Sequence, residues 1–408
     1  TAPDFGARPY DEQVARTGCT VVGARDFLIA VNYNLNTTST RRANAIAFDV
    51  REKGRPMREG NSVDGKPLKD ANGNTIMQPG TLKSTKAIGW YIDEYGIAQV
   101  SMNITKINVT PLHVAFDEVC RAAAARGVRV TGAEIVGLMP KRVLLDAGRH
   151  CLEMQQRSVG IPEDDIIQIA IKSMSLDQLK PFYPKEKVIE MLLEADDDTQ
   201  KLVDLSVKAF TEETSRESPA PGGGTIAACM GAMGAALGTM VANLSAHKRG
   251  WDERWEEFSR WAEKGQALQS RLLRLIDDDT AAFNEIMAAF GMPKSNDEEK
   301  ALRSAAIQTA TLHAAQVPLE TMKTAFEAFA LCKAMAENGN PNSISDAGVG
   351  ALAIRAAVRG ACMNVKINAS SLKDRSLAEP LIAEADRIAK EADRKEAAIT
   401  SFINARLV

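Results

Sequence analysis

Hydrophobic residues change their spacing near residue 181, and this change predicts two parts of different architecture. Before it, short apolar runs typical of strands are interleaved with stretches of helical periodicity. The predicted order is a strand at 26–34, a helix at 41–52, strands at 87–92 and 98–105, a helix at 111–126 and a strand at 130–138. This β-α-β-β-α-β order is typical of a ferredoxin-like α/β sandwich.

Polar residues add two details to this first part. In the strand at 98–105, apolar residues alternate with Gln99, Ser101 and Asn103, so one face of that strand is expected to be polar. Residues 56–83 are polar and rich in turn-forming residues, and they indicate a hairpin.

The second part, from residue 186 to the end, is predicted to be almost entirely helical, with about seven to nine helices. One long helix begins at Trp251 and extends beyond Asp279. Pro318 is predicted to interrupt another, because proline removes a helical hydrogen bond. The run NGNPN at 338–342 indicates a break before a helix that starts at Ser345. The fold class is therefore α+β and multidomain, with an all-α domain after the sandwich.

The segment 218–245 (SPAPGGGTIAACMGAMGAALGTMVANLS) combines a glycine turn with a long run of small residues. Pro221, Gly222, Gly223 and Gly224 form a loop that opens a helix, and the first N–H groups of a helix lack partners within it. These N–H groups and the helix dipole favour an anion or another acceptor. The pattern predicts a site where the backbone approaches a ligand closely.

Two other interpretations of this segment are weaker. Residues 225–244 have the length of a bilayer crossing, but alanine and glycine contribute little transfer free energy and no second span accompanies them. A nucleotide phosphate loop would place Lys and then Ser or Thr after the last glycine, whereas Thr225 and Ile226 follow Gly224 here. We therefore expect no membrane span and no such loop.

Asp279 is the candidate acid or base of the helical part. On a helical wheel it lies in the middle of an apolar stripe, whose other members are Leu268, Leu272, Leu275, Ile276, Phe283 and Ile286. A carboxylate in such a place is paired, hydrogen-bonded or raised in pKa, because burying an unpaired charge costs free energy. General acid–base catalysis and the capping or pairing of a neighbouring helix both fit. Asp277 and Asp278 are expected to be solvated.

A second helical face carries small residues and amides. Its members share one side of the helix that follows Ser345 and are Asp346, Gly350, Ala353, Ala357, Gly360, Asn364 and Asn368. Tight helix packing with satisfied amides and a ligand site both fit this face. The ligand site is favoured if the face meets the small-residue helix after Gly224.

Other features bear less on function. His247, Lys248 and Arg249 form a positive cluster that a helix C-terminus would attract in any case, and His113 is expected to be structural. A net charge of −3 argues against a nucleic-acid binder. Six cysteines without a CxxC pair and four histidines without metal-ligand spacing predict reduced thiols in the cytoplasm and no metal site. The chain begins Thr1-Ala2 without methionine, and we expect it to be part of a longer protein.

Together these segments resemble formimidoyltransferase-cyclodeaminase, the bifunctional folate enzyme family of histidine degradation, over nearly the whole chain. The helical part resembles the family through 218–245, IDDDTAAF (276–283), VPLE (317–320) and CMNVKIN (362–368). The first half resembles it through PDFG (3–6) and the stretches 23–36, 87–105 and 134–147. The resemblance implies a transferase C-terminal subdomain at 1–180, with a folate loop or linker at 1–20. It also implies a linker at 181–195 and a helical cyclodeaminase domain at 196–408.

The resemblance implies a cyclodeaminase that converts 5-formimidoyltetrahydrofolate into 5,10-methenyltetrahydrofolate and ammonia, with Asp279 as the catalytic aspartate. The implied carrier is polyglutamylated tetrahydrofolate, and the other small-molecule partner is formimidoylglutamate. The implied folate contacts are Pro221, Gly222, Gly223, Gly224, Asp346, Asn364, Asn368, Lys248, Arg249, Pro3, Asp4, Phe5 and Gly6. The family also implies a homo-oligomer, a ring-like octamer.

Three further expectations follow from this comparison. The transferase's N-terminal subdomain is expected to be missing, which would leave the transferase half incomplete. A methenyltetrahydrofolate cyclohydrolase on the same helical scaffold is the alternative enzyme. A folate-binding scaffold without catalysis is the alternative of a different class, and the position of Asp279 on the apolar stripe argues against it.

Overall fold

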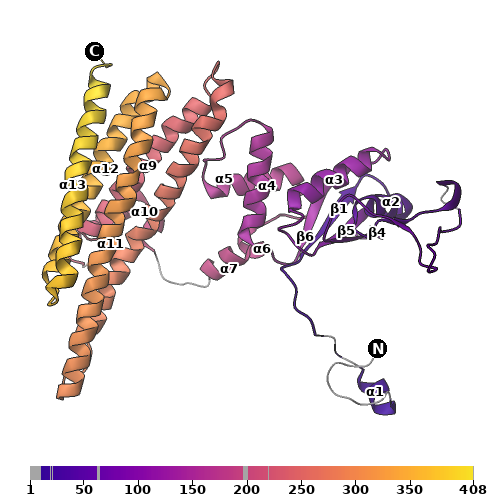
Figure 1. The fold of residues 1–408 in the computed structure, drawn as a ribbon, viewed down its shortest axis with the longest axis horizontal. Helices are drawn as coiled ribbons and strands as arrows, with labels where there is room; N and C mark the ends of the chain where they lie inside the picture. The colour runs from indigo at the N-terminus through magenta and orange to yellow at the C-terminus, as the bar shows by residue number, and fades with distance from the viewer. Residues whose placement is uncertain are drawn as a thin grey trace. The chain divides into compact units, whose positions relative to one another are not determined.

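The computed structural model describes residues 11–18, 20, 22–61, 65–195, 201–218 and 220–407. The chain divides into two units. The first combines Thr1–Val143 with Met174–Leu192, and the second combines Leu144–Ser173 with Leu193–Val408. Figure 1 shows a small sheet with its helices in the first unit and a bundle of long helices in the second. The predicted α+β architecture is confirmed.

The first unit is built on a four-stranded antiparallel sheet. Its strands are β1 (Ile29–Leu35), β4 (Thr85–Ile92), β5 (Ile97–Ile104) and β6 (Val130–Val136), in the order β4-β5-β1-β6. The helices α2 (Thr40–Val50) and α3 (Leu112–Ala124) connect them. Val31 lies opposite Met102 of β5 and Ile135 of β6, so the alternating apolar side chains of three strands meet in one buried layer.

Helix α2 can lie close to the sheet because β4 has a glycine at the contact. A Cβ on Gly89 would come within 2.1 Å of the backbone nitrogen of Asn44. The Asn44 side chain instead exchanges two hydrogen bonds with the Gly89 backbone, at 3.0 and 3.1 Å. The remaining elements of this part are α1 (Glu12–Thr17), the predicted hairpin with β2 (Arg55–Pro56) and β3 (Met77–Gln78), α6 (Pro184–Lys187) and α7 (Ile189–Ala195).

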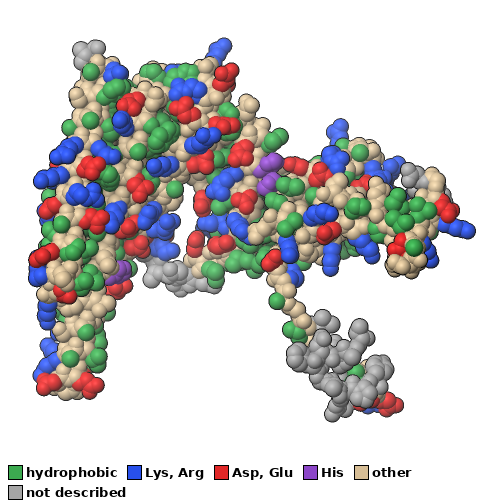
Figure 2. Space-filling model, viewed as in Figure 1, with side chains coloured by type: hydrophobic (Ala, Val, Ile, Leu, Met, Phe, Trp, Pro, Cys, Tyr) green, Lys and Arg blue, Asp and Glu red, His purple; other side chains and the backbone are tan. Residues whose placement is uncertain are grey.

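The second unit is helical. Helix α4 (Lys141–Met154) begins in the first unit, and α5 (Glu163–Met174) follows it. The bundle comprises α8 (Val207–Thr214), α9 (Gly223–Ala246), α10 (Trp255–Phe290), α11 (Asp297–Asn338), α12 (Ile344–Ser370) and α13 (Arg375–Asn404). On the face drawn in Figure 2, positive and negative side chains are interspersed over these helices.

Helix α9 is the small-residue helix at the centre of the bundle, packed against α10, α11 and α12. It runs antiparallel to α12, because its start lies beside Asn364 and its middle beside Gly350 and Ile354. Among the described helices it is the one long and apolar enough to cross a bilayer by length and composition, but 61% of its apolar window is buried inside the unit. Its apolar surface forms part of the bundle core.

The prediction that Pro318 interrupts a helix is wrong, because α11 continues through it. Proline has no N–H to donate to the carbonyl four residues earlier, so the carbonyl of Ala314 loses its helical partner. The side-chain N–H of Asn368, on α12, donates to that carbonyl at 2.6 Å. A neighbouring helix therefore supplies the hydrogen bond that the proline removes.

The cysteines Cys120, Cys151, Cys229, Cys332 and Cys362 are free thiols. Cys332 and Cys362 are buried in the bundle, and burial raises the pKa of both. Cys19 lies outside the described residues.

The close contact of α9 with α12 gives a prediction for Gly234. A Cβ at this position would lie 2.7 Å from the Ile354 side chain and 2.8 Å from the carbonyl oxygen of Gly350. We expect Gly234→Ala to lower the free energy of unfolding by about 1–3 kcal/mol in denaturant titrations, because the helices must move apart. In the matched control Gly360→Ala, the added carbon has an ordinary 3.4 Å contact with Ala227. This control should be neutral, or stabilising by up to about 1 kcal/mol. Equal effects of the two substitutions would contradict the argument.

Candidate active site

A small pocket of about 120 Å³ lies where the start of α9 meets α10, α11 and the end of α12. Its lining combines the glycine turn, one carboxylate and two amides. The lining residues are Ala220, Gly222, Gly223, Gly224, Thr225, Asp279, Thr280, Phe283, Ile286, Ala314, Asn364 and Asn368. Residues separated by about 150 positions in the sequence thus form one site, and most of the site residues predicted for the helical part are among them.

The glycine turn gives α9 a start that another helix can approach. Gly222 is the residue before the helix, and its backbone N–H donates to the Thr225 hydroxyl at 3.3 Å, so this side chain satisfies a backbone donor at the helix start. A Cβ on Gly224 would lie 2.2 Å from Oδ1 of Asp279. Only glycine leaves room for the carboxylate at this position, so the turn and the carboxylate are fitted to each other.

Asp279 receives hydrogen bonds from the first turn of α9. The Thr225 hydroxyl donates to its Oδ2 at 2.9 Å, and the backbone N–H of Thr225 also bonds to the carboxylate. Burial raises the pKa of the Asp279 carboxyl above its ordinary value, and the two Thr225 hydrogen bonds oppose that rise. Asp279 therefore caps a neighbouring helix and also lines a pocket, so the geometry fits both interpretations of the sequence.

The two amides of α12 lie on the opposite side of the pocket. The Asn364 side-chain N–H donates to the carbonyl of Gly360 in its own helix at 3.0 Å, and a Cβ on Gly223 would lie 3.3 Å from the same nitrogen. Asn368 donates to the Ala314 carbonyl next to the pocket. Each amide thus has one fixed hydrogen bond, which orients its remaining polar atoms.

Other residues predicted for the site lie elsewhere. Asp346 is 18 positions before Asn364 on α12, or about 27 Å along the helix, and does not line the pocket. Lys248 and Arg249 follow the opposite end of α9, and the Lys248 amine lies 4.1 Å from the centre of the Trp251 ring. The helical wheel grouped Asp346 with the amides because it gives the face of a helix but not the position along it.

Three smaller predictions have different outcomes. Pro221 is buried between two lining residues without lining the pocket itself. Pro3, Asp4, Phe5 and Gly6 lie outside the described residues. Asp277, expected to be solvated, accepts a hydrogen bond from the Leu202 backbone N–H at 2.8 Å. This hydrogen bond holds the segment that precedes α8 against α10. Burial raises the pKa of the Asp277 carboxyl.

Sequence reasoning did not assign six of the lining residues to the site: Ala220, Thr225, Thr280, Phe283, Ile286 and Ala314. Thr225 could have been found, because a side-chain oxygen at the third position of a helix can accept the backbone N–H of the residue before the helix. Ala314 could not, since its role depends on Pro318 in its own helix and Asn368 in another.

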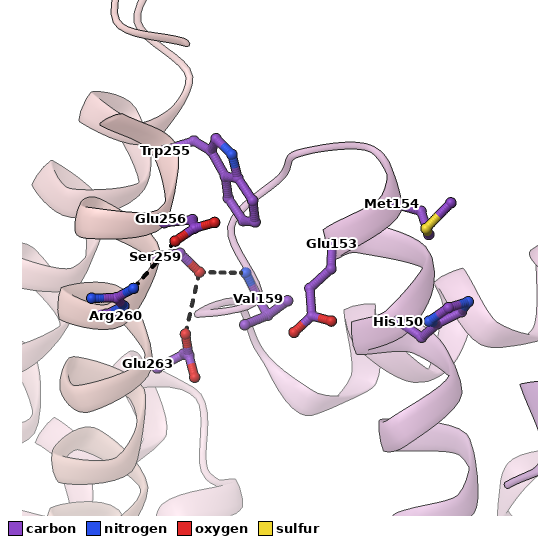
Figure 3. A pocket seen from close by; sticks show the side chains of 9 residues that line it. All are labelled: His150, Glu153, Met154, Val159, Trp255, Glu256, Ser259, Arg260 and Glu263. Atoms are coloured by element: carbon purple, nitrogen blue, oxygen red, sulfur yellow. Dashed lines mark hydrogen bonds and ion pairs between the residues drawn. The ribbon is translucent and has the colours of Figure 1, made fainter. Parts of the chain in front are cut away.

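A larger pocket of the second unit, about 440 Å³, lies between α4 and the first turns of α10 (Figure 3). The Ser259 hydroxyl accepts from the Val159 backbone N–H at 3.1 Å and donates to Glu263 at 3.3 Å. These bonds hold the loop after α4 against α10. Although this pocket is larger, the smaller one holds the buried carboxylate and the glycine turn, so chemistry rather than volume identifies the site.

The first unit carries a second polar cluster on its sheet. Trp90 donates to Gln99 at 3.1 Å, Gln99 donates to Asn34 at 2.7 Å, and Asn34 donates to Gln178 at 2.8 Å. Asn34 and Gln99 are fully buried and lie opposite each other in β1 and β5. The polar face predicted for the strand at 98–105 is the start of this cluster, but Asn34 was missed because its strand was read as uniformly buried.

Comparison with known proteins gives the family. The family profile "Formiminotransferase-cyclodeaminase" matches residues 206–387, and "Formiminotransferase domain" matches residues 30–194. The formimidoyltransferase-cyclodeaminase of Rattus norvegicus is 35% identical over 404 residues, which cover 99% of this chain and 70% of the rat protein. The chain belongs to the formimidoyltransferase-cyclodeaminase family. Its resemblance to that family is thereby confirmed.

Two relatives match one part of the chain each. A methenyltetrahydrofolate cyclohydrolase from Methylorubrum extorquens is 42% identical over 187 residues, covering 46% of this chain and 90% of its own. A glutamate formimidoyltransferase from Thermoplasma acidophilum is 31% identical over 166 residues, covering 41% and 44%. The transferase profile and the cyclodeaminase profile both match this chain. The prediction that it lacks the transferase's N-terminal subdomain is therefore not borne out.

The raised pKa of Asp279 predicts how stability depends on pH. The folded state holds the Asp279 proton more tightly than the unfolded state does, so this group lowers stability as pH rises from the unfolded pKa through the folded pKa. We expect Asp279→Asn to gain free energy of unfolding relative to the wild type as pH rises from the unfolded pKa of aspartate, about 3.9, towards the raised folded pKa, measured in urea titrations. Asp278→Asn, an exposed neighbour, is the control for the loss of one charge. A gain that shrinks as pH rises would contradict the assignment.

Proposed function

We propose that the helical unit is a formimidoyltetrahydrofolate cyclodeaminase, which converts 5-formimidoyltetrahydrofolate into 5,10-methenyltetrahydrofolate and ammonia. The observation that carries this proposal is the Asp279 carboxylate, raised in pKa and held at the glycine turn inside a pocket. A carboxyl group with a raised pKa can both take and return a proton near neutral pH. Membership of the family supplies the substrate class.

In the proposed reaction the folate N10 attacks the carbon of the protonated formimidoyl group on N5. The new N10–C bond leaves N10 with an extra proton, which Asp279 accepts and passes to the former imino nitrogen. That nitrogen then leaves as ammonia when its bond to carbon breaks, and the 5,10-methenyl cation remains. The reaction needs no oxidant or reductant, because a proton is moved and no electrons are exchanged with the protein.

The pocket wall offers a place for the reacting end of the folate. The N–H groups of Gly223 and Gly224, in the first turn of α9, would bind polar atoms of the pterin, with Asn364 and Asn368 facing them. Asp346, Lys248 and Arg249 are not assigned to this end, given their distance along the helices. A polyglutamylated folate, a homo-oligomer and a cytoplasmic location remain part of the proposal through the family.

For the first unit we propose glutamate formimidoyltransferase activity, the transfer of the formimidoyl group between N-formimidoylglutamate and tetrahydrofolate. The named activity of the Thermoplasma relative and the buried amide chain through Asn34 and Gln99 support it. We also interpret the unit as a ferredoxin-like sandwich, supported by the strand order β4-β5-β1-β6. The domain boundaries remain those predicted from the sequence, at about residues 180 and 196.

A substitution of the carboxylate tests the cyclodeaminase. Asp279→Asn should lower ammonia release about 10²–10⁴-fold, because the amide cannot accept a proton. Its oxygen can still accept the Thr225 hydrogen bonds, so we expect the wild-type circular dichroism spectrum and folate binding. Asp278→Asn, on the exposed side of the same helix, should turn over normally. A folded Asn variant with full ammonia release would exclude Asp279 as the proton carrier.

The cyclohydrolase is the second candidate, because the Methylorubrum enzyme of that name is 42% identical over 187 residues, which cover 46% of this chain. In that reaction water attacks the same carbon of 5,10-methenyltetrahydrofolate, the C–N5 bond breaks, and 10-formyltetrahydrofolate forms. Purified protein should be given each substrate in turn, and the methenyl absorbance followed. We expect the absorbance to rise with formimidoyltetrahydrofolate, together with ammonia, and to fall no faster than in buffer with the methenyl substrate. The opposite pair of results favours the cyclohydrolase, and folate binding without either change favours a scaffold.

A further inference from the structure

Within the part of the chain that the structure describes, Thr225 holds the Asp279 carboxylate with both its backbone and its side chain. Its hydroxyl donates to Oδ2 at 2.9 Å, and its backbone N–H also bonds to the carboxylate. The residue is completely buried, at 0% exposure. The hydroxyl oxygen in turn accepts the backbone N–H of Gly222 at 3.3 Å. The glycine turn, the threonine and the carboxylate therefore form one chain of hydrogen bonds.

The direction of these bonds is fixed by the groups that make them. A hydroxyl has a single proton, and a backbone N–H can only donate. Because the Gly222 N–H points to the Thr225 oxygen, the hydroxyl proton is directed to Asp279. Oδ2 is then an acceptor held by the protein. Both carboxylate oxygens lie close to Gly224, because a Cβ there would be 2.2 Å from Oδ1 and 2.7 Å from Oδ2.

We propose that Thr225 is a positioning residue that holds Asp279 through Oδ2, so that the carboxylate is oriented to take the proton from the substrate and return it. This inference rests on the proposed cyclodeaminase function. The reaction itself is unchanged: the proton moves from N10 to the Asp279 carboxylate and then to the leaving nitrogen. Thr225 contributes orientation and stabilises the ionised form that accepts the proton.

Few other groups around Asp279 could set the ionisation of its carboxyl. Among the residues that line the pocket, those from α9, α11 and α12 are uncharged, and Asp279 is the only ionisable one from α10. The pKa of the carboxyl is raised by burial and lowered by Thr225, with no other group contributing. Loss of the hydroxyl should therefore raise this pKa further and reduce the ionised fraction at a given pH.

Two substitutions separate positioning from packing. Thr225→Val keeps the shape and the backbone N–H but removes the hydroxyl, whereas Thr225→Ser keeps the hydroxyl and removes the methyl group. The carboxyl pKa of Asp279 is measured by ¹³C NMR titration, and kcat and KM for ammonia release are measured across pH. We expect the valine variant to shift both the carboxyl titration and the acidic limb of the kcat profile to higher pH. At a pH on the acidic side of the profile, the kcat of the valine variant should be about 10- to 100-fold below that of the wild type, with little change in KM. This is the effect expected for one lost hydrogen bond to a charged group.

The serine variant should follow the wild type in both measurements. A valine variant with the wild-type carboxyl titration and acidic limb would overturn the proposal, as would a serine variant that loses as much activity as valine. The wild type's ammonia release tests the proposed function separately. If the wild type releases no ammonia, the proposed cyclodeaminase function is wrong. The NMR titration still decides whether Thr225 governs the ionisation of Asp279. If the valine variant does not fold, the serine comparison alone decides between hydroxyl and methyl group.

Discussion

The contact that the helical unit depends on is the approach of the Asp279 carboxylate to the open first turn of α9. The N–H groups at the start of a helix need acceptors, and a carboxylate away from water needs donors. Each group satisfies the other across Gly224, which is small enough to let them meet. Because the carboxylate comes from the middle of α10, this contact fixes where along α10 the start of α9 lies.

The small residues of α9 follow from the same constraint. If the turn is to face Asp279 and Asn364 together, α10 and α12 must both run close to α9. The glycines of α9 permit this: Gly231 lies against Leu272 of α10, and Gly234 lies against α12. Leucine at these positions would bury more apolar area but would push the helices apart. The small apolar area that each side chain of α9 buries is thus the cost of bringing three helices to one pocket.

The sequence predicts those parts of the site that have a local signature. Glycine needs no tertiary information to indicate a turn, and the period of the apolar residues places Asp279 on the buried side of its helix. The helical wheel also puts Asn364 on the face that meets α9. It fails for Asp346, because periodicity does not report position along the axis. It fails differently for Pro318, where the local rule predicts a break that a hydrogen bond from another helix, through Asn368, makes unnecessary.

Structural capping and catalysis are usually treated as alternative explanations of a buried acid, but here one geometry serves both. The Thr225 hydrogen bonds stabilise the ionised carboxylate, while burial destabilises it, and the balance leaves its pKa raised. Without the helix end, burial alone would hold the group protonated and unable to accept a proton. With more donors or open solvent, its proton affinity would fall to that of a surface aspartate. A pocket that partly buries the carboxylate at a helix end therefore tunes a group that can take a proton from N10 and still give it up to ammonia.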